Sequence, residues 1–270
     1  MSDGKVRFMG LAIAACTVVA GVIMSLPKVP TRDRTQCCVD STLISFELAP
    51  TAKDAQMVLV TDPAAAADQW PSTEPVRKDV VDKMRQNLNR DAAFFAPSYT
   101  ALFIYFGWLI KRRDRRRVLS LVAIGLALLT FAADEVENWT ALAMLDGAAG
   151  VQTIAPVDEA RVATMRWVSL AKWFLAGLTA LVLAALFWPR QHWPADVELL
   201  SFASTILLIA GAAFAIFGTL STALNPGVDS SIESSLTSIV LAFVPAMVLL
   251  AAYPVWLMSP PSRAEAGNGG

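Results

Sequence analysis

The most regular feature of the chain is a series of long apolar runs separated by shorter polar segments. The runs cover residues 6–26, 94–110, 118–133, 167–188, 199–220 and 236–258. Each is close to the roughly 20 mostly apolar residues with which a helix crosses a bilayer. The pattern predicts an all-α membrane protein, a bundle of six transmembrane helices with a small extracytoplasmic cap between the first and second.

Composition agrees with this class. Of the 270 residues, 55% are hydrophobic and only 17% are charged, whereas a soluble domain has roughly a quarter of its residues charged. The lipid bilayer is therefore the first expected partner. A net charge of −1 gives no reason to expect nucleic acid binding, and nothing in the sequence specifies an oligomeric state.

Orientation follows from the basic segment K-R-R-D-R-R-R at residues 111–117. Lysine and arginine in short loops mark the cytoplasmic side of a membrane protein, so both termini are predicted to be cytoplasmic. Residues 1–26 then form the N-terminus and first helix, and residues 27–93 the cap. Residues 94–258 form a five-helix region, and residues 259–270 a disordered cytoplasmic tail.

Within the cap, three segments have recognisable local patterns. Residues 41–49, S-T-L-I-S-F-E-L-A, mix β-branched and aromatic residues and predict an extended strand. Thr51, followed three residues later by Asp54, predicts the N-terminus of a short helix. From residue 75 to residue 90, an apolar residue recurs every four positions, which predicts an amphipathic helix. This helix is expected to continue into the second crossing, with a kink at Pro97.

Familiar catalytic motifs are absent from the sequence. It contains a single histidine, no zinc-binding His/Cys pattern, no G-x-S-x-G segment and no phosphate-binding loop. We therefore expect no cofactor, and no residue can be named as catalytic. The chemistry available is that of carboxylates, amides and the one lysine that lies within an apolar run.

The candidate site begins in the third apolar run, at D-E-V-E-N-W, residues 134–139. Asp134, Glu137 and Asn138 share one helix face because they are separated by three and four positions. Lys172, in the fourth run, is expected at a matching depth. Ionisable residues in membrane helices usually face the bundle interior, pair with one another and mark function. Three readings stay open: an ion pair that only locks two helices together, a site for a ligand, ion or proton, or an exposed helix end with no partner.

Three further polar residues are expected in the same outer layer. Asp91 and Tyr99 flank the start of the second helix, and Glu47 lies in the cap. Each is unremarkable alone, and their shared depth makes them candidate ligand-binding residues.

These segments resemble a family of uncharacterised polytopic inner-membrane proteins of bacteria. The similarity rests on I-S-F-E-L-A-P-T (44–51), the pair Asp91 and Tyr99, D-E-V-E-N-W (134–139) and A-K-W (171–173), and covers roughly residues 6–175. The family has an F-E-L-A element and a D-x-x-E-N element. The resemblance implies a bacterial inner-membrane protein and carries no activity with it. It places the matching positions in the candidate site, namely Glu47, Asp91, Tyr99, Asp134, Glu137, Asn138 and Lys172.

Three functions are compatible with these patterns. The first is binding of a small polar ligand, a cation such as Ca²⁺ or Mg²⁺, or a lipid headgroup in an outer-leaflet pocket, in association with transport. The second is an enzyme that acts on a lipid-borne substrate with buried carboxylates as acid or base. The third is an assembly protein in which the polar cluster only holds helices together.

Overall fold

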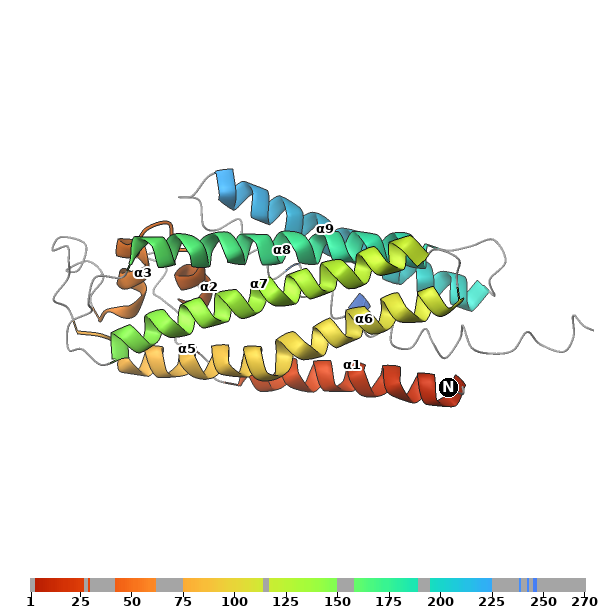
Figure 1. Ribbon diagram of the computed structural model, residues 1–270, viewed down its shortest axis with the longest axis horizontal. Coiled ribbons are helices and arrows are strands. Elements are labelled where there is room, and N and C mark those ends of the chain that lie inside the picture. Colours follow the sequence, from red (N-terminus) through yellow and green to blue (C-terminus); the bar gives the residue numbers. More distant parts are fainter. Residues whose placement is uncertain are drawn as a thin grey trace, which may run out of the picture.

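The computed structural model is an elongated bundle of helices that run side by side (Figure 1). It describes residues 3–26, 29, 42–61, 75–113, 117–149, 158–188, 195–224, 238, 242 and 245–246. The helices in these ranges are α1 (Asp3–Ser25), α2 (Thr42–Glu47), α3 (Ala52–Leu59), α5 (Lys78–Arg90), the π-helix η1 (Asp91–Phe95), α6 (Ala96–Arg113), α7 (Arg117–Ala149), α8 (Glu159–Phe187) and α9 (Ala195–Leu224).

The prediction of an all-helical membrane protein is confirmed for the described residues. Four stretches are long and apolar enough to cross a membrane: Lys78–Leu109, Arg117–Gly147, Glu159–Phe187 and Ser201–Leu224. A fifth apolar helix, Phe8–Ile23 within α1, is shorter, so its crossing stays a prediction. The sixth predicted run, residues 236–258, lies almost entirely outside the described residues, and so does the predicted tail.

The second and third crossings are longer than the apolar runs that predicted them. The amphipathic helix α5 continues through η1 into α6, as expected, and the three form one bent rod (Figure 1). Its predicted apolar stripe is buried. The bend lies at η1, where the Ala96 amide donates to the Asp91 carbonyl five residues earlier. Pro97 explains this wider turn, because its ring would clash with the carbonyl four residues before it in a regular α-helix.

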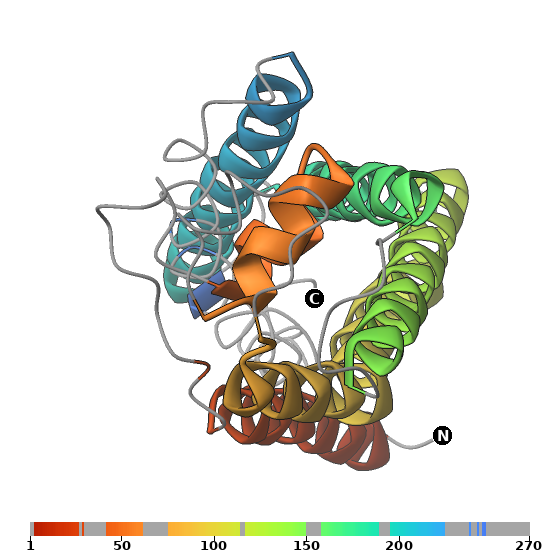
Figure 2. The same cartoon turned by 90° about the vertical axis from the view of Figure 1, so that its left-hand side faces the viewer.

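Helices α2 and α3 lie across one end of the bundle, which we call the α2/α3 end (Figure 2). The strand predicted at residues 41–49 is wrong, because residues 42–47 form helix α2. Helical spacing turns Thr42 and Phe46 to the same buried side, and this burial outweighs the β preference of the local residues. The helix predicted after Thr51 is confirmed as α3, with the Thr51 hydroxyl accepting the Asp54 amide at 3.2 Å.

A hydrophobic core joins α2 and α3 to the long helices. Buried Phe46 and Leu59 belong to the same cluster as Met84 on α5, Leu145 on α7 and Met165 on α8. A polar contact reinforces the junction, since the Ala52 amide of α3 donates to the Glu159 carboxylate at the start of α8 at 3.1 Å. These two short helices are therefore packed on the bundle by apolar burial rather than tethered beside it.

Close helix packing fixes the rest of the bundle. Neighbouring pairs are α1 with α6, α6 with α7, α7 with α8, and α8 with α9. At Gly177 a β-carbon would lie 2.9 Å from the Ile216 side chain and 3.1 Å from Ala215 on α9. Gly107 is similarly close to Ile124 on α7, whereas Gly125 has nothing within 4 Å. Gly107 and Gly177 therefore permit close helix packing, whereas Gly125 faces open space among the described residues.

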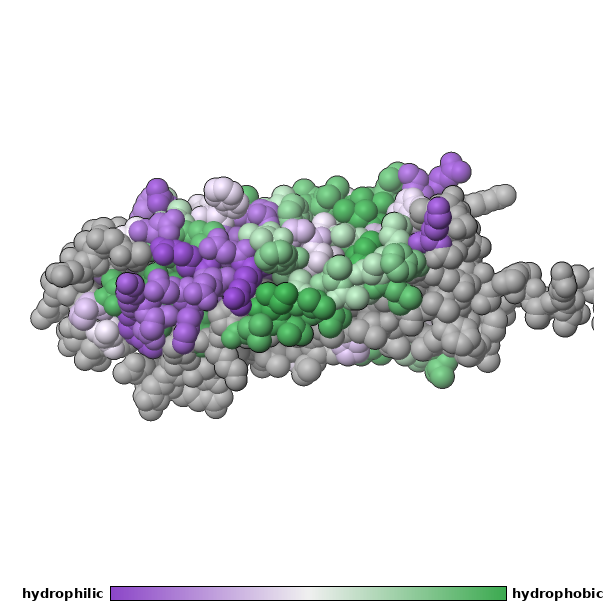
Figure 3. All heavy atoms as spheres, turned by 90° about the horizontal axis from the view of Figure 1, so that it is seen from below, coloured by the Kyte–Doolittle hydropathy of each residue, from purple (hydrophilic) through white to green (hydrophobic). Residues whose placement is uncertain are grey.

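The surface is divided as expected for a protein that crosses a membrane. On the face seen in Figure 3, hydrophilic side chains gather at the α2/α3 end and hydrophobic ones form a band beside them. Trp167 on α8 and Trp188, directly after its last residue, are 58% and 53% exposed. They lie about 32 Å apart along the helix axis at about 1.5 Å per residue. This spacing matches a hydrocarbon core of roughly 30 Å with tryptophan at both interfaces.

Candidate functional site

The seven residues predicted from the sequence come together near the α2/α3 end. They are contributed by α2 (Glu47), η1 (Asp91), α6 (Tyr99), α7 (Asp134, Glu137 and Asn138) and α8 (Lys172). Five elements from distant parts of the chain thus place one polar group or more in a common cluster, which we call the carboxylate cluster. Its role in ligand binding stays a prediction.

Lys172 is at the centre of the carboxylate cluster. Its ammonium lies 3.0 Å from Asp134 Oδ1 and 2.5 Å from Glu137 Oε2. The side chains of Lys172, Asp134 and Glu137 are 12%, 4% and 0% exposed. The two acids reach the same ammonium because they lie three positions apart on one face of α7. A second contact holds the lysine, whose ammonium is 5.3 Å from the centre of the Trp173 ring, within cation–π range.

Two neutral donors each bind one further carboxylate oxygen. The Tyr99 hydroxyl of α6 donates to Asp134 Oδ2 at 2.8 Å, so this aspartate binds one group on each of two neighbouring helices. The Asn138 amide donates to Asp91 Oδ2 at 3.0 Å. The wide turn of η1 determines where Asp91 lies, because Asp91 is its first residue. Such turns are frequent at functional sites.

Glu47 enters the carboxylate cluster from outside the long helices. It is buried at the end of α2, and its carboxyl lies within hydrogen-bonding reach of that of Glu137. Burial raises the pKa of the Glu47 carboxyl well above its usual range, and the Glu137 charge raises it further, while the Lys172 ammonium lowers it. A hydrogen bond between two carboxyl groups requires a proton on one of them.

The charges of the carboxylate cluster do not balance. Among the described residues of the cluster, four carboxyl groups, those of Glu47, Asp91, Asp134 and Glu137, surround one ammonium, that of Lys172. Within the described part of the chain, Glu137 Oε1 is buried without a hydrogen-bond partner. An uncompensated buried charge is costly, so the excess negative charge favours bound protons or a bound cation.

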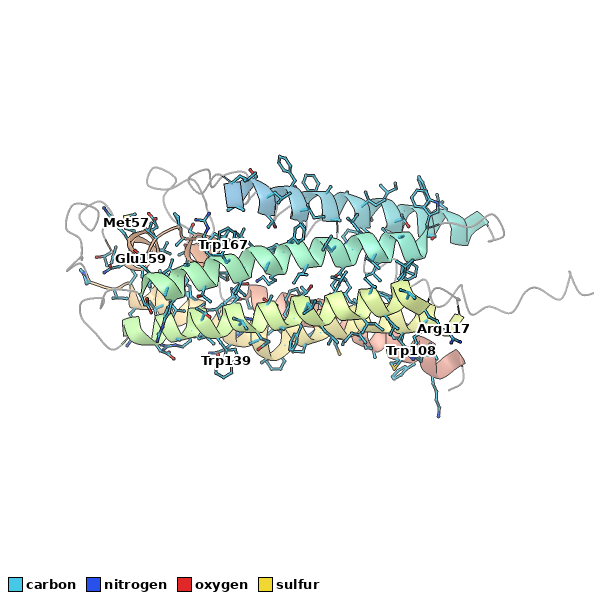
Figure 4. All side chains as sticks on the ribbon, turned by 45° about the horizontal axis from the view of Figure 1, so that its top comes forward. Met57, Trp108, Arg117, Trp139, Glu159 and Trp167 are labelled. Carbon is cyan, nitrogen blue, oxygen red and sulfur yellow. The ribbon has the colours of Figure 1, made fainter. Side chains whose placement is uncertain are left out.

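The carboxylate cluster lies within the apolar band but close to its edge. Lys172 is about 8 Å along α8 from Trp167, and Asp134 is a similar distance along α7 from Trp139. Trp139 is 72% exposed and projects away from the bundle (Figure 4). Arg117 lies at the opposite end of α7 in the same view. The site is therefore shallow, because only about one and a half helical turns separate it from the nearer membrane boundary.

A binding site for Ca²⁺ or Mg²⁺ is not supported. Among the residues that the structure describes, no three His, Cys, Asp or Glu side chains are arranged to hold a metal ion. The physical reason is the position of Lys172, whose ammonium already occupies the space between Asp134 and Glu137. A hard cation would need several of those oxygens at once.

Among the buried polar side chains that the sequence did not single out are Gln56 and Ser169. Gln56 on α3 is fully buried, and neither amide atom has a hydrogen-bond partner among the described residues. It could have been found from spacing, because Ala52, Gln56 and Leu59 share one face of α3. Ser169 on α8 is also fully buried with an unpartnered hydroxyl, and it lies one turn before Lys172.

Comparison with known proteins returned no family model that matches this chain, no similar curated protein and no similar solved structure.

Proposed function

We propose that this protein is a multi-pass membrane protein whose carboxylate cluster binds a small cationic group near the outer face of the membrane, in association with transport. The observation that carries the proposal is the charge imbalance: among the described residues of the cluster, four carboxyl groups, three of them buried, face one ammonium. The proposed setting is the inner membrane of a bacterium with both termini in the cytoplasm, on the strength of the basic segment at residues 111–117 and the family resemblance.

The geometry around Lys172 suggests the class of ligand. A primary ammonium already lies between two carboxylates there, at 3.0 and 2.5 Å. Glu47 and Asp91, the other two acids of the cluster, have no comparable ion pair among the described residues. A second ammonium would supply the missing positive charge. It could come from a free amine or from the headgroup of a phosphatidylethanolamine lipid, which carry the same group.

The first test uses the full chain in detergent with methylammonium and ethanolamine as probes. Either probe should raise the unfolding temperature in a saturable manner, because a ligand that binds only the folded state stabilises it. Asp91→Asn should weaken the apparent affinity at least about tenfold, equal to about 1.4 kcal/mol. Asp146→Asn is the matched control, since this acid is 67% exposed and pairs with Arg85. It should bind as the wild type does.

A second arm separates the two sources of the ammonium. The protein is placed in nanodiscs of phosphatidylethanolamine or of phosphatidylglycerol alone. A lipid ligand should stabilise the protein only in the first membrane, in which free amine should then add nothing. A free amine should act in both. If neither the free amines nor phosphatidylethanolamine stabilises the protein, the proposed function is wrong.

One observation favours a second candidate, a structural lock. Lys172 joins α8 to α7 through two short ion pairs, and this alone could hold the helices in register. The variant Lys172→Met, Asp134→Asn, Glu137→Gln removes all three charges together. The lock is the better reading if Lys172→Met alone is destabilising, the triple variant is as stable as the wild type, and the wild type binds no amine.

A further inference from the structure

Glu47 differs from the other carboxylates of the cluster in its origin. It lies on α2, which belongs to none of the four candidate membrane spans. The core that packs α2 and α3 on the long helices brings its side chain to Glu137. Packing of this short helix therefore brings the carboxyl groups of Glu47 and Glu137 together in a buried site.

Two carboxylates in contact cannot both be ionised at low cost, because like charges in a buried site repel strongly. Glu137 has the stronger reason to stay charged, since its Oε2 lies 2.5 Å from the Lys172 ammonium. Its Oε1 is buried and lacks a hydrogen-bond donor among the described side chains. A protonated Glu47 supplies the missing donor, and the raised pKa of Glu47 agrees with that assignment.

We infer that Glu47 and Glu137 form a proton-binding site, in which Glu47 carries a proton at neutral pH, donates it to Glu137, and releases it when a cationic group enters the cluster. On release, the O–H bond of Glu47 breaks, the proton passes to water, and the new carboxylate pairs with the incoming ammonium. The net charge of the cluster is the same before and after. Only the release step rests on the proposed function; the stored proton does not.

The charged groups around Glu47 define its titration. The groups that shift the Glu47 pKa are Glu137 from α7, Lys172 from α8 and Asp91 from η1. Asp134 instead accepts a hydrogen bond from Tyr99 and forms an ion pair with Lys172. Two other charged residues of α8 are engaged elsewhere. Arg166 donates to the Thr222 carbonyl of α9 and Glu159 accepts the Ala52 amide. The pair is thus flanked by one cation and by several acids that favour retention of the proton.

Infrared spectroscopy on the full chain without ligand tests the stored proton. The wild type at pH 7 should show the C=O stretching band of a buried carboxylic acid. The difference between wild type and Glu47→Gln should contain this band and no carboxylate bands. If Glu47→Gln does not fold, the wild-type spectrum still decides, because its lack of a carboxylic acid band at pH 7 would overturn the inference. Loss of carboxylate bands on substitution would overturn it too.

Binding of methylammonium as a function of pH tests the release. If one proton is exchanged, the apparent Kd of the wild type should rise about tenfold for each unit by which pH falls. Glu47→Gln should lose that slope, while Asp146→Asn should keep it. An unchanged slope in Glu47→Gln would show that another group releases the proton and would overturn the exchange. An acid band without any amine binding would instead refute the proposed function alone, and the proton site would stand.

Discussion

Removal of the Lys172 ammonium is the most direct test of how the carboxylate cluster is held together. The substitution Lys172→Met keeps the length and apolar stem of the side chain but deletes its charge. Asp134 and Glu137, 4% and 0% exposed, then lose their shared counter-ion. Breaking a buried ion pair by removing one partner costs about 3–5 kcal/mol, because the other charge stays behind without compensation. The variant should lose stability by that amount.

The free energy of unfolding can be measured in mixed micelles as the fraction of denaturing detergent increases. Asp146→Asn serves as the control, since it removes an ion pair of 2.6 Å whose acid is 67% exposed. Exposed pairs contribute about 0–1 kcal/mol, so the control should stay within that range. If Lys172→Met costs no more than this control, the cluster is solvated, and the reasoning from burial is refuted.

The remaining predictions concern the hydrogen bond, the helix packing and the pH dependence. Tyr99→Phe removes the hydrogen-bond donor 2.8 Å from Asp134 Oδ2. It should lower the free energy of unfolding by about 1.5–3 kcal/mol, as expected for a hydrogen bond to a charged group. A change near zero would mean that water replaces the hydroxyl. Gly177→Val forces a β-carbon within 2.9 Å of α9 and should destabilise the protein by about 1–3 kcal/mol. Gly125→Ala has open space around it and should stabilise the protein by up to about 1 kcal/mol. Equal effects of the two substitutions would contradict the close contact of α8 with α9 at Gly177. Folding raises the pKa of Glu47, so the folded protein holds the Glu47 proton more tightly than the unfolded chain. The stability that this proton contributes is lost as pH rises from about 4.3 through the folded pKa. Glu47→Gln should flatten that decline in the unfolding midpoint, and an unaltered pH profile would exclude the raised pKa.

The sequence by itself determined the helical membrane class and much of the candidate site. Apolar runs define crossings because backbone groups in lipid must be bonded within the helix. Spacing alone placed Asp134, Glu137 and Asn138 on one face. Depth along α8 indicated that Lys172 could reach them, and the ion pairs at 3.0 and 2.5 Å show that it does. These predictions succeeded because helical periodicity and rise are local properties that need no knowledge of neighbours.

Other features were decided only by the tertiary structure. The segment at residues 41–49 has the composition of a strand, yet it is a helix because Phe46 is buried against the long helices. The same packing brings Glu47 to Glu137. The π-helix η1, which Pro97 explains, positions Asp91. The balance of four carboxyl groups against one ammonium is likewise invisible in a net charge of −1. Local preference is weaker than burial, and charges interact by distance in space rather than along the chain.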